Sequence, residues 1–149
     1  MLAKGELKLD EQLCFALYSA SRLVTRAYRP VLAALSLTYP QYLVMMVLWE
    51  RSAVGDAAPT LGRLATRLML DSSTLTPLVK RLEQRELVKR VRDPHDDRTI
   101  FLELTEAGFD LEAAAMKVPS DMMCSRELEV AALIDLRDRV RVFVEQMTQ

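Results

Sequence analysis

The sequence contains few of the residues that mark several common classes of protein. Among its 149 residues, glycine occurs four times, cysteine twice and histidine once. So little glycine argues against a β-sandwich or barrel with many tight turns, and against glycine-rich phosphate-binding loops. Two cysteines are too few for a disulfide scaffold, and with one histidine they offer no zinc-ligand spacing. The sequence also lacks the uninterrupted apolar run of about 18 residues that a membrane span requires.

What is present suits a folded domain. Half of the residues are apolar and 28% are charged, so the chain is able to bury a core, unlike a disordered one. Its length predicts a single domain. The first 12 residues contain no apolar run of the kind found in secretory signals. We therefore expect a cytoplasmic protein without a membrane partner. We expect neither a metal nor another cofactor.

Charge is distributed unevenly along the chain. The formal net charge is −1, but residues 60–98 hold nine Lys or Arg against six Asp or Glu, and residues 99–149 hold five against ten. Local charge rather than net charge decides whether a polyanion binds. The basic middle segment is compatible with a nucleic-acid surface and also with a solvated helix face.

Helical periodicity predicts most of the secondary structure. Apolar residues recur every three or four positions from Leu9 to Leu35, a helix that Pro30 should kink or end. Thr38 is the expected N-cap of a central buried helix that carries Pro40 in its first turn. Thr60 is expected to open the next, shorter helix.

A second short helix and a hairpin follow. Either Ser73 or Asp71 caps this helix, and Ser73 is favoured because it places Pro77 in the first turn. Residues 88–92 and 99–104 alternate like strands around a polar turn. Helix resumes from Thr105 through Met116, and the last helix carries an apolar seam suited to another helix, at Leu133, Leu136, Val140, Phe143 and Met147.

The order helix, helix and charged-tip hairpin is typical of a mainly α winged helix-turn-helix, whose second helix lies in the major groove of DNA. Long cations neutralise phosphates, and an arginine on a protruding hairpin suits a narrow minor groove. A solvated helix and loop would have the same sequence pattern. The candidate DNA contacts are Ser73, Thr74, Thr76, Pro77, Lys80 and Arg81 on the helix and Arg90, Arg92 and Arg98 on the wing.

Three segments resemble a known family. The run LDSSTLTPLVKRLEQRELVKRVRDPHDDRTIFLELTEAG at residues 70–108 resembles the MarR winged-helix repressors. The motifs LCFALYSASR and TYPQY, within residues 9–50, are similar to its organic-hydroperoxide-sensing OhrR branch. The resemblance implies a homodimer that binds a double-stranded, pseudo-palindromic operator and takes an organic hydroperoxide as inducer. Residues 1–36 and 105–149 would form the dimerisation helices, and residues 37–104 the DNA-binding region.

The resemblance also assigns a redox site. Cys14 occupies the position of the sensing cysteine, and Tyr28 and Tyr39 match two tyrosines of the partner subunit whose hydroxyls support the thiolate. Tyr18 lies one helical turn beyond Cys14 and is expected in the same pocket, with an apolar wall of Phe15, Leu17, Met45, Met46 and Trp49. Taken by itself, a lone cysteine on an apolar stretch is more often a small buried core residue. The alternative for the two tyrosines is ordinary packing at an interface, with the hydroxyl in water.

Cys124 lies near the position of the resolving cysteine in two-cysteine sensors, where it would form an inter-subunit disulfide with Cys14, although a bystander thiol remains an alternative. Three other functions stay open. They are a MarR repressor released by a phenolic ligand, a thiol peroxidase that turns over hydroperoxide without DNA, and a helical adaptor whose wing binds protein. The sole histidine, His95, falls in the wing turn and is expected to be solvated or near a phosphate.

Overall fold

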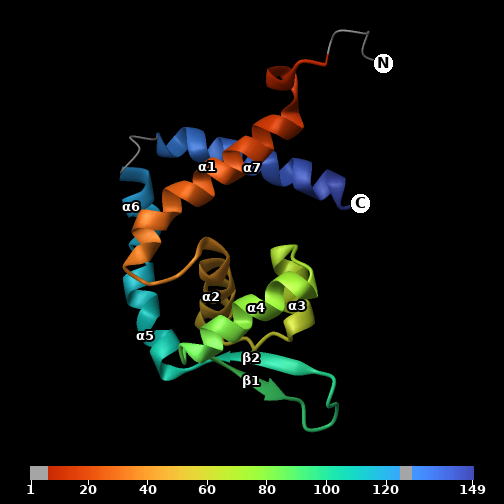
Figure 1. Ribbon diagram of the computed structural model, residues 1–149, viewed down its shortest axis with the longest axis vertical. Coiled ribbons are helices and arrows are strands. Elements are labelled where there is room, and N and C mark those ends of the chain that lie inside the picture. The colour runs from red at the N-terminus through yellow and green to blue at the C-terminus, as the bar shows by residue number, and fades with distance from the viewer. Residues whose placement is uncertain (1–6, 125–128) are drawn as a thin grey trace. The chain divides into compact units, whose positions relative to one another are not determined.

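The computed structural model describes residues 7–124 and 129–149, with the backbone alone for Cys124. It has the element order of a mainly α winged helix-turn-helix (Figure 1), as the sequence predicts. The chain divides into two compact units, Met1–Met116 and Lys117–Gln149. The first unit contains the helix-turn-helix and the wing.

The first long helix is shorter than expected at its start. A 3-10 turn η1 (Leu9–Glu11) comes before α1 (Leu13–Ala33), and the extended backbone of Gln12 separates them. Of the two effects expected of Pro30, a kink or an end of the helix, the second does not occur, because α1 continues for three more residues. Pro30 removes one helical hydrogen bond, to the carbonyl of Arg26, and both residues are exposed, so solvent can reach that oxygen.

Helix α2 (Tyr39–Ala53) forms the centre of the first unit. It begins as predicted, with Thr38 as its N-cap and Pro40 in the first turn. In addition, Thr38 and Gln41 form a capping box in which the side chain of each accepts the backbone N–H of the other. It packs against α1, α3, α4 and α5, so its side chains are buried on nearly every face. The fully buried core of this unit consists of Leu32, Val44, Met45, Leu64, Leu75, Val79, Leu82, Val88 and Leu102.

The helix-turn-helix consists of α3 (Leu61–Leu68) and α4 (Ser72–Gln84). Thr60 caps α3 as predicted. The N-cap of α4 is Asp71 and not Ser73, which corrects the sequence-based choice. The Asp71 carboxylate accepts the Thr74 N–H at 2.7 Å and also the Ser73 hydroxyl at 2.6 Å. A carboxylate can accept both bonds at once. Because the helix begins at Ser72, Pro77 is its sixth residue and lies beyond the first turn.

The wing is an antiparallel pair of strands, β1 (Val88–Arg92) and β2 (Ile100–Leu104), in which Val88 lies opposite Leu104. The hairpin is also attached to the segment before α3. The N–H of Leu102 donates to the Pro59 carbonyl at 2.9 Å, and Thr60 pairs with Phe101. The base of the wing is therefore fixed to the helix-turn-helix by backbone hydrogen bonds.

A close backbone contact joins α2, the wing and α5 (Glu106–Ala115). The indole N–H of Trp49 donates to the Gly108 carbonyl at 2.9 Å in a buried position. A Cβ placed on Gly108 would lie 2.1 Å from the carbonyl oxygen of Leu87, just before β1. Only glycine fits this approach without a backbone shift.

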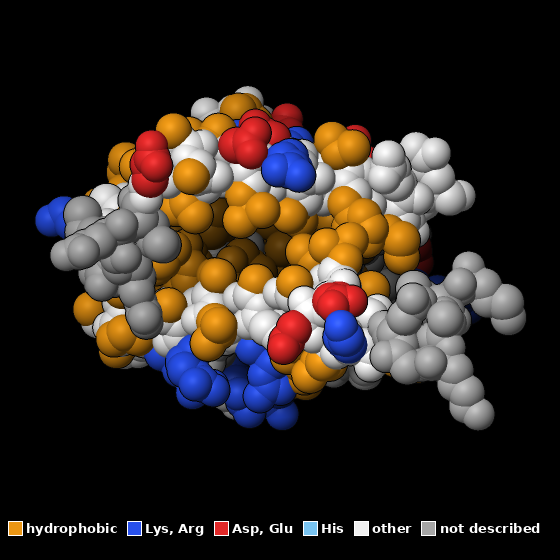
Figure 2. Space-filling model, turned by 90° about the horizontal axis from the view of Figure 1, so that it is seen from above, with side chains coloured by type: hydrophobic (Ala, Val, Ile, Leu, Met, Phe, Trp, Pro, Cys, Tyr) orange, Lys and Arg blue, Asp and Glu red, His pale blue; other side chains and the backbone are white. Residues whose placement is uncertain are grey.

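The second unit contains α6 (Val118–Cys124) and α7 (Val130–Met147). No residue of α7 is buried. The predicted apolar seam is present, since Leu136 and Met147 are exposed and the other three members are partly exposed. Figure 2 shows one face of the molecule on which hydrophobic side chains are widely exposed among charged ones. In the described part of the chain, no helix has the length and apolar character needed to cross a bilayer.

We predict that Gly108→Ala lowers the free energy of unfolding by about 1–3 kcal/mol, because the added methyl group must displace the Leu87 carbonyl. Urea denaturation measures this change. Gly62→Ala is the matched control, since its new Cβ would find no atom closer than 4.0 Å and glycine is a poor helix former. Equal unfolding free energies for both variants would contradict the proposed close contact.

Candidate DNA interface and redox site

Helix α4 presents an exposed polar face. All six residues that the sequence suggests for DNA contact on this helix are exposed. Hydrogen bonds from the Ser73 hydroxyl and then from the Thr74 backbone hold the pKa of Asp71 below its usual range, so the cap stays ionised at neutral pH. Ser73 is thereby engaged with the cap, whereas the Lys80 and Arg81 side chains make no ion pair or hydrogen bond with the described residues.

Two aspartates order the tip of the wing. Asp93 accepts the N–H of His95 at 2.8 Å, and Asp96 accepts the N–H of Arg98 at 3.0 Å and the hydroxyl of Thr99 at 2.8 Å. The Arg98 and Thr99 bonds lower the pKa of Asp96. The turn is therefore fixed by its own side chains while the Arg98 guanidinium is exposed and unpaired among the described residues.

The cations at the base of the wing have other partners. The Arg90 guanidinium donates two hydrogen bonds to one carboxylate oxygen of Glu83, at 2.6 and 2.9 Å, and the Arg90 backbone N–H donates to the other oxygen. These bonds lower the pKa of Glu83. Lys89 pairs with Glu103 at 3.1 Å across the strands. Of the wing cations, Arg92 and Arg98 are the two that make no ion pair within the described chain.

Cys14 lies in the first turn of α1, exposed and without a disulfide partner among the described residues. Tyr28 is 14 positions further along the same unbroken helix, a separation of about 21 Å at 1.5 Å per residue. The structure therefore does not bring Cys14 together with Tyr28 inside one chain. Tyr18 is exposed near the cysteine end and accepts a hydrogen bond from Arg22 at 2.8 Å.

Three tyrosines form a ring cluster at the other end of α1. The rings of Tyr28 and Tyr39 lie 4.8 Å apart, and Tyr42 lies 6.2 and 6.4 Å from them. Burial raises the pKa of all three phenols, and neighbouring phenols raise it further for Tyr28 and Tyr42. The hydroxyls stay protonated at neutral pH and are able to donate hydrogen bonds. The sequence-based site omitted Tyr42, although its spacing of three from Tyr39 puts both on one helix face.

The other predicted redox residues are scattered. Met45 and Trp49 are buried in the core of the first unit, and Met46 is exposed on the same helix. Phe15 and Leu17 are partly exposed on α1. Cys124 is the last residue of α6, and its side chain lies outside the described residues.

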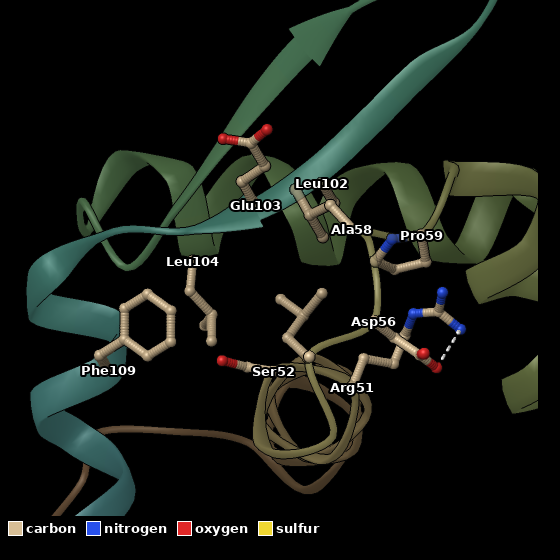
Figure 3. Close-up of a pocket in the computed structure, with 11 residues that line it drawn as sticks. Arg51, Ser52, Asp56, Ala58, Pro59, Leu102, Glu103, Leu104 and Phe109 are labelled. Carbon is tan, nitrogen blue, oxygen red and sulfur yellow. Dashed lines mark ion pairs between the residues drawn. The ribbon is translucent and has the colours of Figure 1, made fainter.

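A cavity of about 380 Å³ lies between α2, the loop that follows it, β2 and α5 (Figure 3). Leu104 and Phe109 line one side, and the Arg51–Asp56 ion pair, with 3.9 Å between charged atoms, lies on the other. Sequence reasoning missed this cavity. Its residues come from three separate segments, and the sequence showed only a loop at residues 52–59.

An exposed polar helix and an ordered two-stranded wing define a winged helix-turn-helix DNA-binding protein. Residues 26–113 match the family model described as transcriptional regulator SarA/Rot. The chain is 37% identical over 143 residues to the organic hydroperoxide resistance transcriptional regulator of Bacillus subtilis (strain 168), an alignment that covers 96% of this chain and 94% of that protein.

Solved structures give the same result. One similar structure is that of reduced AbfR, a protein of Staphylococcus epidermidis, bound to DNA. It matches this chain with a TM-score of 0.75 and 33% sequence identity, and the match covers 95% of each chain. The disulfide-formed state of AbfR has a TM-score of 0.64 and 34% identity over 91% of this chain and 92% of that one. The chain belongs to the MarR family of winged-helix transcriptional regulators.

Proposed function

We propose that this transcriptional regulator is a homodimeric repressor that releases its operator when an organic hydroperoxide oxidises Cys14. The observation that carries the proposal is the placement of Cys14 and the tyrosine cluster at opposite ends of one continuous helix. A second copy related by a twofold axis can put its Tyr28 and Tyr39 beside Cys14, which the same chain cannot do. The B. subtilis relative, a regulator of organic hydroperoxide resistance, supports the inducer class.

Exposed apolar residues support the proposed dimer. The seam on α7 offers one apolar surface to a second copy, and Leu23 and Val24 of α1 offer another. A symmetric dimer reads a pseudo-palindrome whose half-sites are about 34–36 Å apart, or a multiple of that spacing. DNA-bound AbfR supports an operator of double-stranded DNA.

Within each half-site, α4 enters the major groove with Thr74, Thr76, Pro77, Lys80 and Arg81 facing DNA. Arg92 and the ordered tip residue Arg98 reach the adjacent backbone or minor groove. Because Glu83 already binds Arg90 with two of its oxygens, we assign to Arg90 the task of orienting the wing and not a direct DNA contact.

We predict that Arg98→Ala weakens operator binding by about 1–3 kcal/mol if the guanidinium reads base edges, as measured by fluorescence anisotropy. If Arg98 touches only phosphate, the loss is uniform across sequences and the salt slope falls by about one. Lys89→Ala is the control, because this wing cation is paired with Glu103. Unchanged affinity for Arg98→Ala would remove the wing tip from the interface.

The proposed oxidation of Cys14 takes place in two steps. In the first step the Cys14 thiolate attacks the terminal oxygen of the hydroperoxide ROOH, and the O–O bond breaks. The products are Cys14 sulfenic acid and the alkoxide RO⁻, and the alkoxide takes up a proton to give the alcohol. The sulfenic acid then condenses with the Cys124 thiol, giving a disulfide and one water. The disulfide-formed state of AbfR supports a second cysteine that resolves the oxidised one.

A DNA-shift assay with cumene hydroperoxide tests the function directly. We expect the wild-type complex to dissociate and Cys14→Ser to remain bound, because serine is not oxidised. On non-reducing gels the oxidised wild type should give a disulfide-linked dimer, which Cys124→Ser should not form. Release of Cys14→Ser by the hydroperoxide would refute the sensing role. Release of the wild type without a linked dimer at any dose would leave a one-cysteine sensor.

The tyrosines are predicted to activate the thiolate. Replacing Tyr28 and Tyr39 together by Phe should slow oxidation of Cys14 and leave DNA binding by the reduced protein intact. Without these hydrogen-bond donors the thiolate is less well stabilised, so its reactive fraction at neutral pH falls. The rate of Cys14 alkylation at neutral pH measures the change. Tyr42→Phe keeps the ring cluster and serves as control; equal rates in all variants would make the tyrosines packing residues.

The cavity in Figure 3 favours a second candidate, release by a small phenolic ligand. Its volume lies within the range of small-molecule sites, and Phe109 would face the ring, with the Arg51–Asp56 ion pair on the opposite side of the cavity. The same DNA-shift assay separates the two functions. Dissociation of Cys14→Ser by salicylate, together with no response to hydroperoxide in the wild type, would establish this ligand-release function in place of the redox one.

A further inference from the structure

Arg85 connects the recognition helix to the segment between α1 and α2. It follows the last residue of α4, and its guanidinium donates to two successive carbonyl oxygens, Ser36 at 2.5 Å and Leu35 at 3.0 Å. These residues are about 50 positions away in sequence. Hydrogen bonds from a charged donor are the stronger kind, and two of them from a planar fork also fix orientation.

The segment that Arg85 binds connects the two helices that carry the tyrosine cluster. Ser36 has a φ of 51°, the left-handed conformation that turns the chain from α1 into α2. Tyr39 begins α2 three residues later, and Tyr28 lies on the last turns of α1. Because the turn is short and Leu35 is buried, a movement of α1 relative to α2 that separates the two tyrosine rings would also move the carbonyls that Arg85 binds.

The same end of α4 also holds the wing. Glu83, two residues before Arg85, binds Arg90 of β1 at 2.6 Å. The Glu86 carbonyl accepts the hydroxyl of Thr105, which follows β2. A displacement of Arg85 is therefore a displacement of the recognition helix and of the wing together.

We propose that Arg85 is the positioning residue that transmits the state of the Tyr28–Tyr39 pair to the DNA-binding elements. This inference rests on the proposed redox function. In the reduced protein the two hydrogen bonds hold α4 at the angle that fits the operator. When oxidation of Cys14 withdraws the partner from the tyrosines, the turn shifts and Arg85 carries α4 with it. A simple structural role, satisfying the carbonyls at the end of α1, would not require this coupling.

The test compares the operator Kd of oxidised and reduced protein, with cumene hydroperoxide as oxidant and the extent of Cys14 oxidation matched by mass spectrometry. For Arg85→Gln we expect the ratio of the two Kd values to fall at least tenfold below that of the wild type. Arg85→Lys, which keeps the charge but only a single-point donor, should lie between them. Arg81→Gln, one turn earlier on α4, should weaken both states and keep the ratio within threefold.

The outcomes separate the two ideas. A wild type whose Kd does not change on oxidation overturns the proposed function, and the transmission with it. A responsive wild type with an Arg85→Gln ratio within threefold of its own overturns the transmission alone, even if the variant melts at a lower temperature. If Arg85→Gln does not fold, Arg85→Lys decides, because an unchanged ratio there together with a lower melting temperature shows a structural role only.

Discussion

The approach of α5 to the start of the wing is the constraint on which the first unit depends. The Gly108 backbone lies against the Leu87 carbonyl, and Trp49 of the central helix binds the Gly108 carbonyl from the other side. Thr105 adds a backbone hydrogen bond to the same Leu87 oxygen at 3.1 Å. The contacts around Gly108 and the Leu87 carbonyl thus fix α2, α5 and the wing relative to one another.

A second constraint is the continuity of α1. Because the helix is continuous from Leu13 to Ala33, its two ends cannot meet within a chain, whatever the side chains do. The sensor proposed above would then be a property of the assembled dimer, and its chemistry would be available only where the protein is also competent to bind a symmetric operator. In that proposal, sensing and DNA binding share one requirement, the association of two copies.

Much of the fold could be predicted because its signals are local. The cap at Thr38, the cap at Thr60 and the alternating strands act over a few residues, and the structure confirms them. The choice of Ser73 over Asp71 was wrong because the argument rested on Pro77, whereas the carboxylate accepts two bonds that the sequence does not display. Contacts such as Arg85 with Ser36 join distant segments and leave no periodic signal. The pairing of Arg90 with Glu83 spans only seven positions, but it joins a strand to a helix, so neither the helical nor the strand period displays it.

The exposed surface of α7 has a thermodynamic consequence. An 18-residue helix with no buried residue gains little stability from within its own unit, since most helical stability in proteins comes from packing of an amphipathic face. Its order must come from whatever covers its apolar seam. If that cover is a second copy, the melting temperature rises with protein concentration, and dilution toward the few molecules present in a cell lowers it by mass action. The abundance of such a regulator would then help determine how much of it is folded.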